Sequence, residues 1–379
     1  MATGDGGAGR LARRHLDAAS SEPLHPAARE TLLAALDAGW ADPRRLHHEA
    51  RNARLLLDNA RAATAEALDV RPDEVTFAAS GTEATHRGLL GLAQARRHVG
   101  RRVVQSAVEH AAVVHAARWW GEPTEVGADP LGRVRLDELA GAARGGDVAV
   151  AALQSANHEV GTVQDVDDLR LPDGVPLFVD ACASMGRRPL PARWDAAAGS
   201  AHKWGGPAGV GVLLVRRSAA WESPFPDDDR ADHRASGFEN VPAALAAAAA
   251  LQAVVAERDE VAARQRALVA RVREVAASLE DVDVVGDPDR RLPHLVTFSV
   301  LYVSGDRLVA ELDRRGLAVA SGSACTASSL EPSRVLAAMG ALTQGNVRVS
   351  LTRTTTADDV EVLCRALPEV VAELRADPA

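Results

Sequence analysis

Lysine is almost absent from this chain. Of its 43 basic residues, 42 are arginines and only one, Lys203, is a lysine. An ammonium group can lose its proton and condense with a carbonyl, whereas a guanidinium, with a pKa above ~12, can do neither. A coding bias toward arginine explains why lysine is scarce, but not why one remains. We therefore predict that Lys203 serves through the chemistry of its amine; a chance surface lysine is the alternative.

Cysteine is scarce too. The three cysteines, Cys182, Cys325 and Cys364, are an odd number in a chain of 379 residues, so they do not make a disulfide framework and they suit a reducing compartment. The sequence also lacks an apolar run of the roughly 18 to 20 residues that span a membrane, and its start lacks the apolar core of a secretory signal. These absences predict a cytoplasmic protein with no membrane contact.

An excess of positive charge is missing as well. The formal net charge is -9, which gives no basic footprint for direct nucleic-acid binding. The composition, 47% hydrophobic and 25% charged, is typical of a globular protein with a sizeable core. An enzyme acting on small molecules fits these values better. The acidic loop PFPDDDRADHR (224–234) is interpreted as a solvated loop rather than a metal cluster, so no metal site is predicted.

Hydrophobic periodicity predicts an α/β fold. Helical periodicity covers 26–37 and 49–68, and an apolar strand at 74–79 leads through a tight turn into a helix that ends near 97. Further apolar runs alternate with helical or loop segments, as in a mostly parallel sheet. These runs are 102–105, 148–153, 175–179 and 210–215.

A change in pattern predicts a second, smaller domain. A long alanine-rich helical stretch at 241–279 precedes strands near 295–300, 317–320 and 347–351. We expect 1–15 to be disordered and 16–250 to form the large domain, with 16–40 packing on the small domain. The small C-terminal α+β domain, 251–379, should carry a loop at 321–332.

Polar residues follow several of the predicted strands. Ser80-Gly81-Thr82 opens a helix and offers N–H groups and a hydroxyl to an anion such as phosphate, although Ser and Thr are also ordinary helix caps. Asp180 is either a solvent-facing carboxylate or the partner of a protonated ring nitrogen. His110 is a cap, a core histidine or a partner for a planar ring, and Asn157 could simply turn a loop. Together with Lys203, these residues supply the parts of a pyridoxal 5'-phosphate site.

The order and spacing of several motifs carry a family resemblance. The motifs are SGTE, EH, NHEVG, VDA, SAHK, SGSACTASSLEPSRVL and VRVSL. This chain resembles the cysteine desulfurases of the NifS/IscS type, within the class V aminotransferase-like fold, from HLDAASSEPLHP to RVSLTRTTT. The resemblance implies fold type I of the pyridoxal-phosphate transferases, with a mostly parallel seven-stranded sheet in the large domain. It also implies a homodimer that converts L-cysteine to L-alanine and passes the sulfur to an acceptor protein.

The resemblance also implies a role for each motif residue. Lys203 would bind the cofactor covalently, Asp180 would pair with its ring nitrogen, and His110 would stack on the ring and handle protons. Four residues would hold the cofactor phosphate: Gly81, Thr82, Ser200 and His202. Asn157 would touch the ring hydroxyl and the substrate, and Arg348 would clamp the substrate carboxylate.

Cys325 lies in a segment of small, hydroxylated residues, SGSACTASSLEP. By the resemblance it is the nucleophile that accepts sulfur as a persulfide. A cysteine that attacks a substrate and then carries sulfur elsewhere needs a mobile backbone, which small residues allow. The alternative, a small core hydrophobe, is the common fate of a free cysteine, but this segment offers no apolar face. Cys182 and Cys364 are predicted to be packing residues.

Some positions depart from the family pattern. Ala183 stands where a glutamine is usual, Phe238 where relatives have a threonine that reaches the partner's phosphate, and Thr85-His86 where an Asp-Asn pair is usual. Two other functions therefore stay open: a carbon–sulfur or selenocysteine lyase on the same fold, and a catalytically weak sulfur-relay or scaffold protein. The acceptor pathway is also open among iron–sulfur assembly, tRNA thiolation, DNA phosphorothioation and natural-product synthesis.

Overall fold

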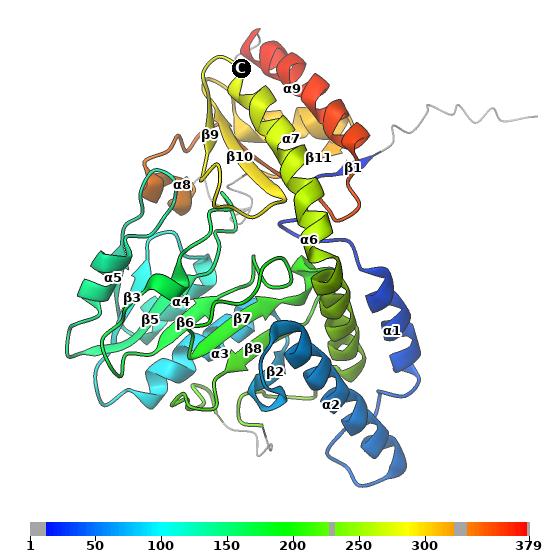
Figure 1. Cartoon of the computed structure of the whole chain (residues 1–379), viewed down its shortest axis with the longest axis vertical. Helices are drawn as coiled ribbons and strands as arrows, with labels where there is room; N and C mark the ends of the chain where they lie inside the picture. The colour runs from blue at the N-terminus through cyan, green and yellow to red at the C-terminus, as the bar shows by residue number, and fades with distance from the viewer. Residues whose placement is uncertain (1–12, 227–231, 322–331, 377–379) are drawn as a thin grey trace, which may run out of the picture.

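The computed structural model describes residues 13–226, 232–321 and 332–376. A large sheet with flanking helices and a smaller layer of strands and helices are joined by one long helix, α6 (Figure 1). We expected residues 1–15 to be disordered. Of these, 1–12 lie outside the described residues. Arg14 and His15, at the end of that segment, form the short strand β1 (Arg14–His15), so this end of the segment is ordered.

The large sheet has seven strands in the order β2-β8-β7-β6-β5-β3-β4. They are β2 (Val75–Ala78), β3 (Arg102–Ser106), β4 (Glu122–Val126), β5 (Val148–Gln154), β6 (Leu177–Asp180), β7 (Ala196–Ser200) and β8 (Gly211–Val215). Only β8 runs antiparallel to its neighbours, so the predicted mostly parallel sheet is confirmed. The sequence did not predict β7, because its residues, AAAGS, have little strand propensity.

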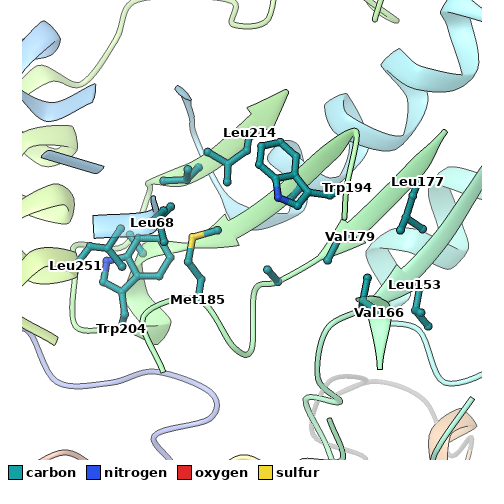
Figure 2. Close-up of a cluster of buried hydrophobic side chains, with 14 of the residues drawn as sticks. Leu68, Leu153, Val166, Leu177, Val179, Met185, Trp194, Trp204, Leu214 and Leu251 are labelled. Atoms are coloured by element: carbon teal, nitrogen blue, oxygen red, sulfur yellow. The ribbon is translucent and has the colours of Figure 1, made fainter. Parts of the chain in front are cut away.

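Both faces of the large sheet are buried. Along β5 all seven residues are buried, as expected for a strand covered on both sides. Alternate residues enter two separate cores: Val179 belongs to one and Phe178, its neighbour, to the other. Figure 2 shows the first core, with Trp204 and Met185 beside Leu251 of α6.

Helices cover the large sheet and extend beyond it. They are α1 (Pro26–Leu36), α2 (His48–Leu68), α3 (Gly81–Ala95), α4 (Ala111–Trp120), α5 (Leu136–Ala142) and α6 (Val241–Ala277), with short 3-10 turns η1 (Pro72–Glu74), η2 (Val166–Asp168) and η3 (Ala201–Lys203). Both α1 and α2 pack on α6, and α3 packs on β7, β8 and α4. Among the described helices only α6 is long and apolar enough to cross a membrane, and half of its apolar window is buried inside the protein.

The smaller layer contains two further sheets. Strand β10 (Leu295–Val300) lies between β9 (Val282–Val285) and β12 (Asn346–Ser350), antiparallel to both, and β1 pairs with β11 (Leu317–Ala318). Its helices are α7 (Gly305–Arg314), α8 (Arg334–Met339) and α9 (Ala357–Ala376). A third core combines Leu16 with residues from the C-terminal half of α6 and from α9. The expected domain boundary at 250 falls inside α6, which runs through both layers.

Candidate active site

A cavity lies at the carboxyl ends of β5 and β6, where parallel sheets commonly bind ligands. Its volume is about 150 Å³. Seven of the predicted site residues line it: Gly81, Thr82, His110, Asp180, Ser200, His202 and Lys203. The other lining residues are Thr85, Ala112, Gln154, Ala156, His158, Cys182 and Ala183. Segments that are far apart in the sequence therefore converge on one site.

One end of the cavity is formed by the first turn of α3. Ser80 caps the helix, with its Oγ accepting a hydrogen bond from the Glu83 N–H at 3.0 Å. The N–H groups of the first helical residues have no intrahelical acceptor and attract anions. A side chain at Gly81 would bring its Cβ within 2.6 Å of Ser200 Cβ, so only glycine lets these two segments meet. Ser200 Oγ in turn lies 3.2 Å from His202 Nδ1, which completes a polar cradle for an anion.

Lys203 and Asp180 come from neighbouring strands. Lys203 ends η3, directly after β7, and its backbone oxygen accepts a hydrogen bond from Arg187 Nη2 at 3.1 Å. Asp180 ends β6, is 6% exposed, and its Oδ1 accepts a hydrogen bond from the Cys182 N–H at 2.9 Å. Because β6 and β7 are paired in parallel, both chain segments leave the sheet at the same edge. The only amine-bearing side chain and a buried carboxylate thus share one cavity.

His110 is held as a neutral imidazole. It caps α4, with its Nδ1 accepting a hydrogen bond from the Ala112 N–H at 3.1 Å, which assigns the proton of the neutral ring to Nε2. Burial, with the nearby His158 and Lys203, lowers the pKa of His110 well below its ordinary value. The rings of His110 and His158 meet edge to face, with centroids 4.8 Å apart. The sequence reasoning missed His158, although it lies inside the NHEVG motif that was singled out.

Asn157 and Arg348 do not line this cavity. Asn157 is fully buried; its Nδ2 donates to the Val108 carbonyl at 3.1 Å and its Oδ1 accepts from two backbone N–H groups of its own loop. Arg348 Nη1 donates to the His158 carbonyl at 3.0 Å, while its Nη2 forms an ion pair with Asp17 at 3.0 Å. In this structure both residues hold the loop that carries His158.

Cys325 lies outside the described residues, which stop at Ser321 and resume at Pro332. The chain on both sides of this gap is anchored near the cavity. Ala320 and Arg348 exchange two backbone hydrogen bonds, and Ser333 Oγ donates to Glu159 Oε2 at 2.5 Å. Glu159 follows His158 directly, so both anchors adjoin the loop that contacts His110.

The other two cysteines are poor nucleophiles. Cys182 lines the cavity, but burial and then the nearby Asp180 raise the pKa of its thiol well above the ordinary value. Cys364 packs in the third core, where burial raises the pKa of its thiol to about 11. A thiol with a raised pKa offers little thiolate at neutral pH.

Glu109 is a buried carboxyl to which the sequence reasoning gave no role, although it belongs to the EH motif. Its Oε1 accepts hydrogen bonds from Ser106 Oγ at 2.7 Å and from the Gln154 N–H at 2.8 Å. Burial, opposed by these hydrogen bonds and helped by the charge of Asp180, raises the pKa of Glu109 to about 8. The carboxyl is therefore neutral at pH 7, and it ties together the ends of β3 and β5 next to His110.

The raised pKa of Glu109 predicts a pH-dependent stability. The unfolded chain releases this proton near pH 4.5 and the folded protein holds it to about pH 8, so the folded state binds more protons between these values. The contribution of Glu109 to the free energy of unfolding should therefore fall as pH rises through this window and stay constant above it. Urea unfolding of the native protein and of Glu109→Gln, which keeps an oxygen acceptor, should give stability curves that differ in slope from pH 5 to 8. Parallel curves would show that the carboxyl is ionised in the folded protein.

The chain is similar to known proteins over nearly its whole length. A family model described as aminotransferase class-V matches residues 14–363. An IscS-like cysteine desulfurase of Mycobacterium tuberculosis is 36% identical, over 95% of this chain and 97% of that protein. The cysteine desulfurase IscS of Dictyoglomus turgidum is 30% identical, over 95% of both chains. The solved structure of a NifS-like protein matches with a TM-score of 0.88 and 25% identity, covering 96% of this chain and all of that one.

These findings confirm the resemblance read from the motifs and the fold that it implied. The match runs through nearly the whole chain, and the curated relatives are covered almost in full. The chain therefore belongs to the class V aminotransferase family, in the group of the NifS- and IscS-like cysteine desulfurases.

Proposed function

We propose that this protein is a pyridoxal 5'-phosphate-dependent enzyme that converts L-cysteine to L-alanine and transfers the sulfur to Cys325 as a persulfide. The observation that carries the proposal is the position of the only lysine of the chain, which shares a cavity with a buried carboxylate and an anion cradle. The names of the curated relatives support the same reaction.

The cavity residues fit this cofactor. Lys203 offers the amine for the covalent link, and Asp180 offers the carboxylate for the ring nitrogen. The first turn of α3, with Gly81 and Thr82, offers N–H groups to the phosphate, and the hydroxyl of Ser200 lies beside it. When bound, pyridoxal 5'-phosphate supplies an electron sink for the negative charge that develops at the substrate Cα.

The protein's own residues then move the protons. We assign Lys203 Nζ as the base that takes the proton from the substrate Cα, since a lysine amine can be deprotonated and an arginine cannot. We assign to His110, whose neutral imidazole carries its proton on Nε2, the exchange of a proton with the substrate sulfur or with Cys325. Asp180 would accept the N–H of the ring nitrogen and so favour its protonated form.

The sulfur transfer needs no added oxidant. The Sγ of Cys325, as a thiolate, attacks the substrate sulfur, and an S–S bond forms while the substrate Cβ–S bond breaks. The electrons of the broken bond stay on the carbon side, which takes up protons and leaves as alanine. The anchoring of both flanks of the Cys325 segment next to the His158 loop supports this assignment.

We further propose a homodimer in the cytoplasm that hands sulfur to an acceptor protein. Five large apolar side chains are exposed on α1, α2 and the turn between them: Leu33, Leu36, Trp40, Leu46 and Leu55. Leu46, the most open of them, is 89% exposed. Large apolar side chains exposed on neighbouring elements are typical of an interface between subunits, and a second copy is the occupant that we propose. Light scattering of the purified protein should give twice the mass of one chain.

The reaction is tested by exposing the cofactor-loaded protein briefly to L-cysteine. We expect an intact-protein mass increase of one sulfur atom, mapped to Cys325 by peptide analysis, with a matching amount of alanine. Release of free sulfide or pyruvate with an unmodified Cys325 would instead indicate a lyase. No product at all would indicate a scaffold.

A further inference from the structure

A second, smaller cavity adjoins the one that holds Lys203. The two cavities share His158, Ala183 and Lys203 as lining residues, so Lys203 borders both. The second cavity has a volume of about 10 Å³, roughly the space that one water-sized group needs. A molecule that reacts at the amine of Lys203 can therefore place its larger part in the first cavity and one small group in the second.

His294 lines this second cavity, and the proposed reaction gives it no role. The residue directly precedes β10, and its backbone oxygen accepts a hydrogen bond from the Leu351 N–H, just after β12, at 2.8 Å. His294 is only 2% exposed. Two neighbouring strands of the smaller layer therefore fix a buried imidazole beside the amine of Lys203.

The imidazole of His294 has an unmet hydrogen-bonding atom. Within the described part of the chain, its Nδ1 is buried and has no hydrogen-bond partner. In His110, by contrast, Nδ1 accepts a hydrogen bond from the Ala112 N–H. A buried polar atom without a partner costs free energy, because it has lost its hydrogen bonds to water. A ligand in the adjoining cavity would supply the partner that the folded chain does not.

The charges around this cavity favour an anionic group. None of the described residues that line it is acidic, whereas Lys203 and Arg187 are basic, and Arg187 is already paired with Glu22 at 2.8 Å. Burial first, and then the positive charges of Arg187 and Arg348, lower the pKa of His294 well below its ordinary value. The imidazole is therefore neutral at pH 7 and keeps one N–H to donate. The carboxylate is the anionic group of an amino-acid substrate, and it fits these surroundings better than a thiol does.

The two residues that the family resemblance assigns to the substrate are largely engaged elsewhere. Arg348 Nη1 donates to the His158 carbonyl, and its Nη2 donates to Asp17 at 3.0 Å and to Ser20 Oγ at 2.6 Å, so only its buried Nε lacks a partner. The side-chain amide of Asn157 is bonded to backbone groups. Neither residue lines the second cavity. A further donor for the substrate is therefore needed in this chain.

We propose that His294 is a substrate-binding residue whose Nδ1–H donates a hydrogen bond to the carboxylate of the amino-acid substrate. The inference rests on the proposed function, because it takes as substrate an amino acid that reacts at Lys203. The contact selects amino acids over amines that have no carboxylate. The small volume of the second cavity leaves no room for a larger group at this position.

Two small ligands that differ only in the carboxylate test this contact: L-alanine and ethylamine. Their affinities for the cofactor-loaded protein are measured by calorimetry. His294→Leu should bind L-alanine about tenfold or more weakly than the native protein, because a hydrogen bond to a charged group is lost, and it should bind ethylamine as the native protein does. His294→Asn, which keeps an N–H donor, should bind L-alanine more tightly than His294→Leu. In turnover, the KM of His294→Leu for L-cysteine should rise with little change in kcat, because the contact is present before and during the reaction.

Stability without any ligand gives a second readout. His294→Leu should raise the thermal midpoint of the cofactor-free protein, because an apolar side chain of similar size replaces a buried polar group that has no partner. Thr64→Val is the matched control. Thr64, on α2, is fully buried, its Oγ1 has no hydrogen-bond partner within the described residues, and it lines neither cavity. This variant should also raise the midpoint, but it should leave the affinity for L-alanine unchanged.

Equal affinity of His294→Leu and the native protein for L-alanine would overturn the proposal. An equal loss of affinity for both ligands would also overturn it, because the carboxylate would then not be the group that His294 contacts. A lowered midpoint of His294→Leu would show that the imidazole is already satisfied in the free protein. Failure of the proposed function is a different result: the native protein would form no alanine from L-cysteine, whereas the affinities and the midpoints would still decide the role of His294.

Discussion

Replacing Lys203 with alanine should lower the rate of alanine formation from L-cysteine by about 10⁴-fold, because a positioned base that moves the substrate proton contributes up to that factor. Lys203→Arg should be equally inactive, since it keeps the positive charge but cannot lose its proton at neutral pH. Alanine formation under substrate saturation is the measurement. Borohydride reduction of the cofactor-loaded native protein should attach the cofactor to a single peptide, the one that contains Lys203.

The scarcity of lysine allows a sharp control for this experiment. Lys203→Ala removes the only lysine of the chain. Adding Arg217→Lys, at an exposed position on the surface, restores the number of lysines but puts the amine outside the cavity. The double variant should stay inactive. If the double variant regained activity or cofactor attachment, a lysine amine at another position would be sufficient, and the assignment of Lys203 would be wrong.

Replacing Cys325 with serine should abolish the persulfide on the protein and reduce alanine turnover to background, while cofactor binding is kept. A hydroxyl cannot take the place of a thiolate in attack on sulfur, and the other two cysteines have raised pKa values that leave them mostly protonated at neutral pH. The persulfide is measured by intact mass, and cofactor binding by the absorbance of the loaded protein.

Cys364→Ala is the control for the cysteine experiment. Cys364 packs in the third core, away from the cavity, so its loss should lower stability slightly and leave the Cys325 persulfide in place. Sustained sulfur transfer by Cys325→Ser would mean that another residue accepts the sulfur. Cys182, which lines the cavity, would then be the first residue to examine.

The sequence predicted the fold where periodicity and side-chain type agree. The helices at 26–37, 49–68 and 241–279 and the strand at 295–300 have the expected apolar patterns, and the structure has helices or strands there. Strand β7 was missed because alanine and glycine do not favour strands. It forms because β6 and β8 lie on either side and its backbone completes their hydrogen bonds.

The sequence also identified residues whose chemistry is unusual in this chain. A single lysine, and one cysteine among small polar residues, stand out without any coordinates. Asp180 could be selected because a polar group at the end of an apolar strand commonly faces a ligand, whereas Ser200 and His202 were selected through the family resemblance. All three line the cavity with Lys203.

Only the tertiary structure decided which side chains meet. It joins His158 to His110, buries Glu109 beneath them, and turns Asn157 and Arg348 toward neighbouring backbone and Asp17 rather than into the cavity. Residue type determines which reactions and contacts a side chain can make, and residue type is known from the sequence. Burial and the charges of neighbours fix what it does do, and these depend on parts of the chain that only folding brings together.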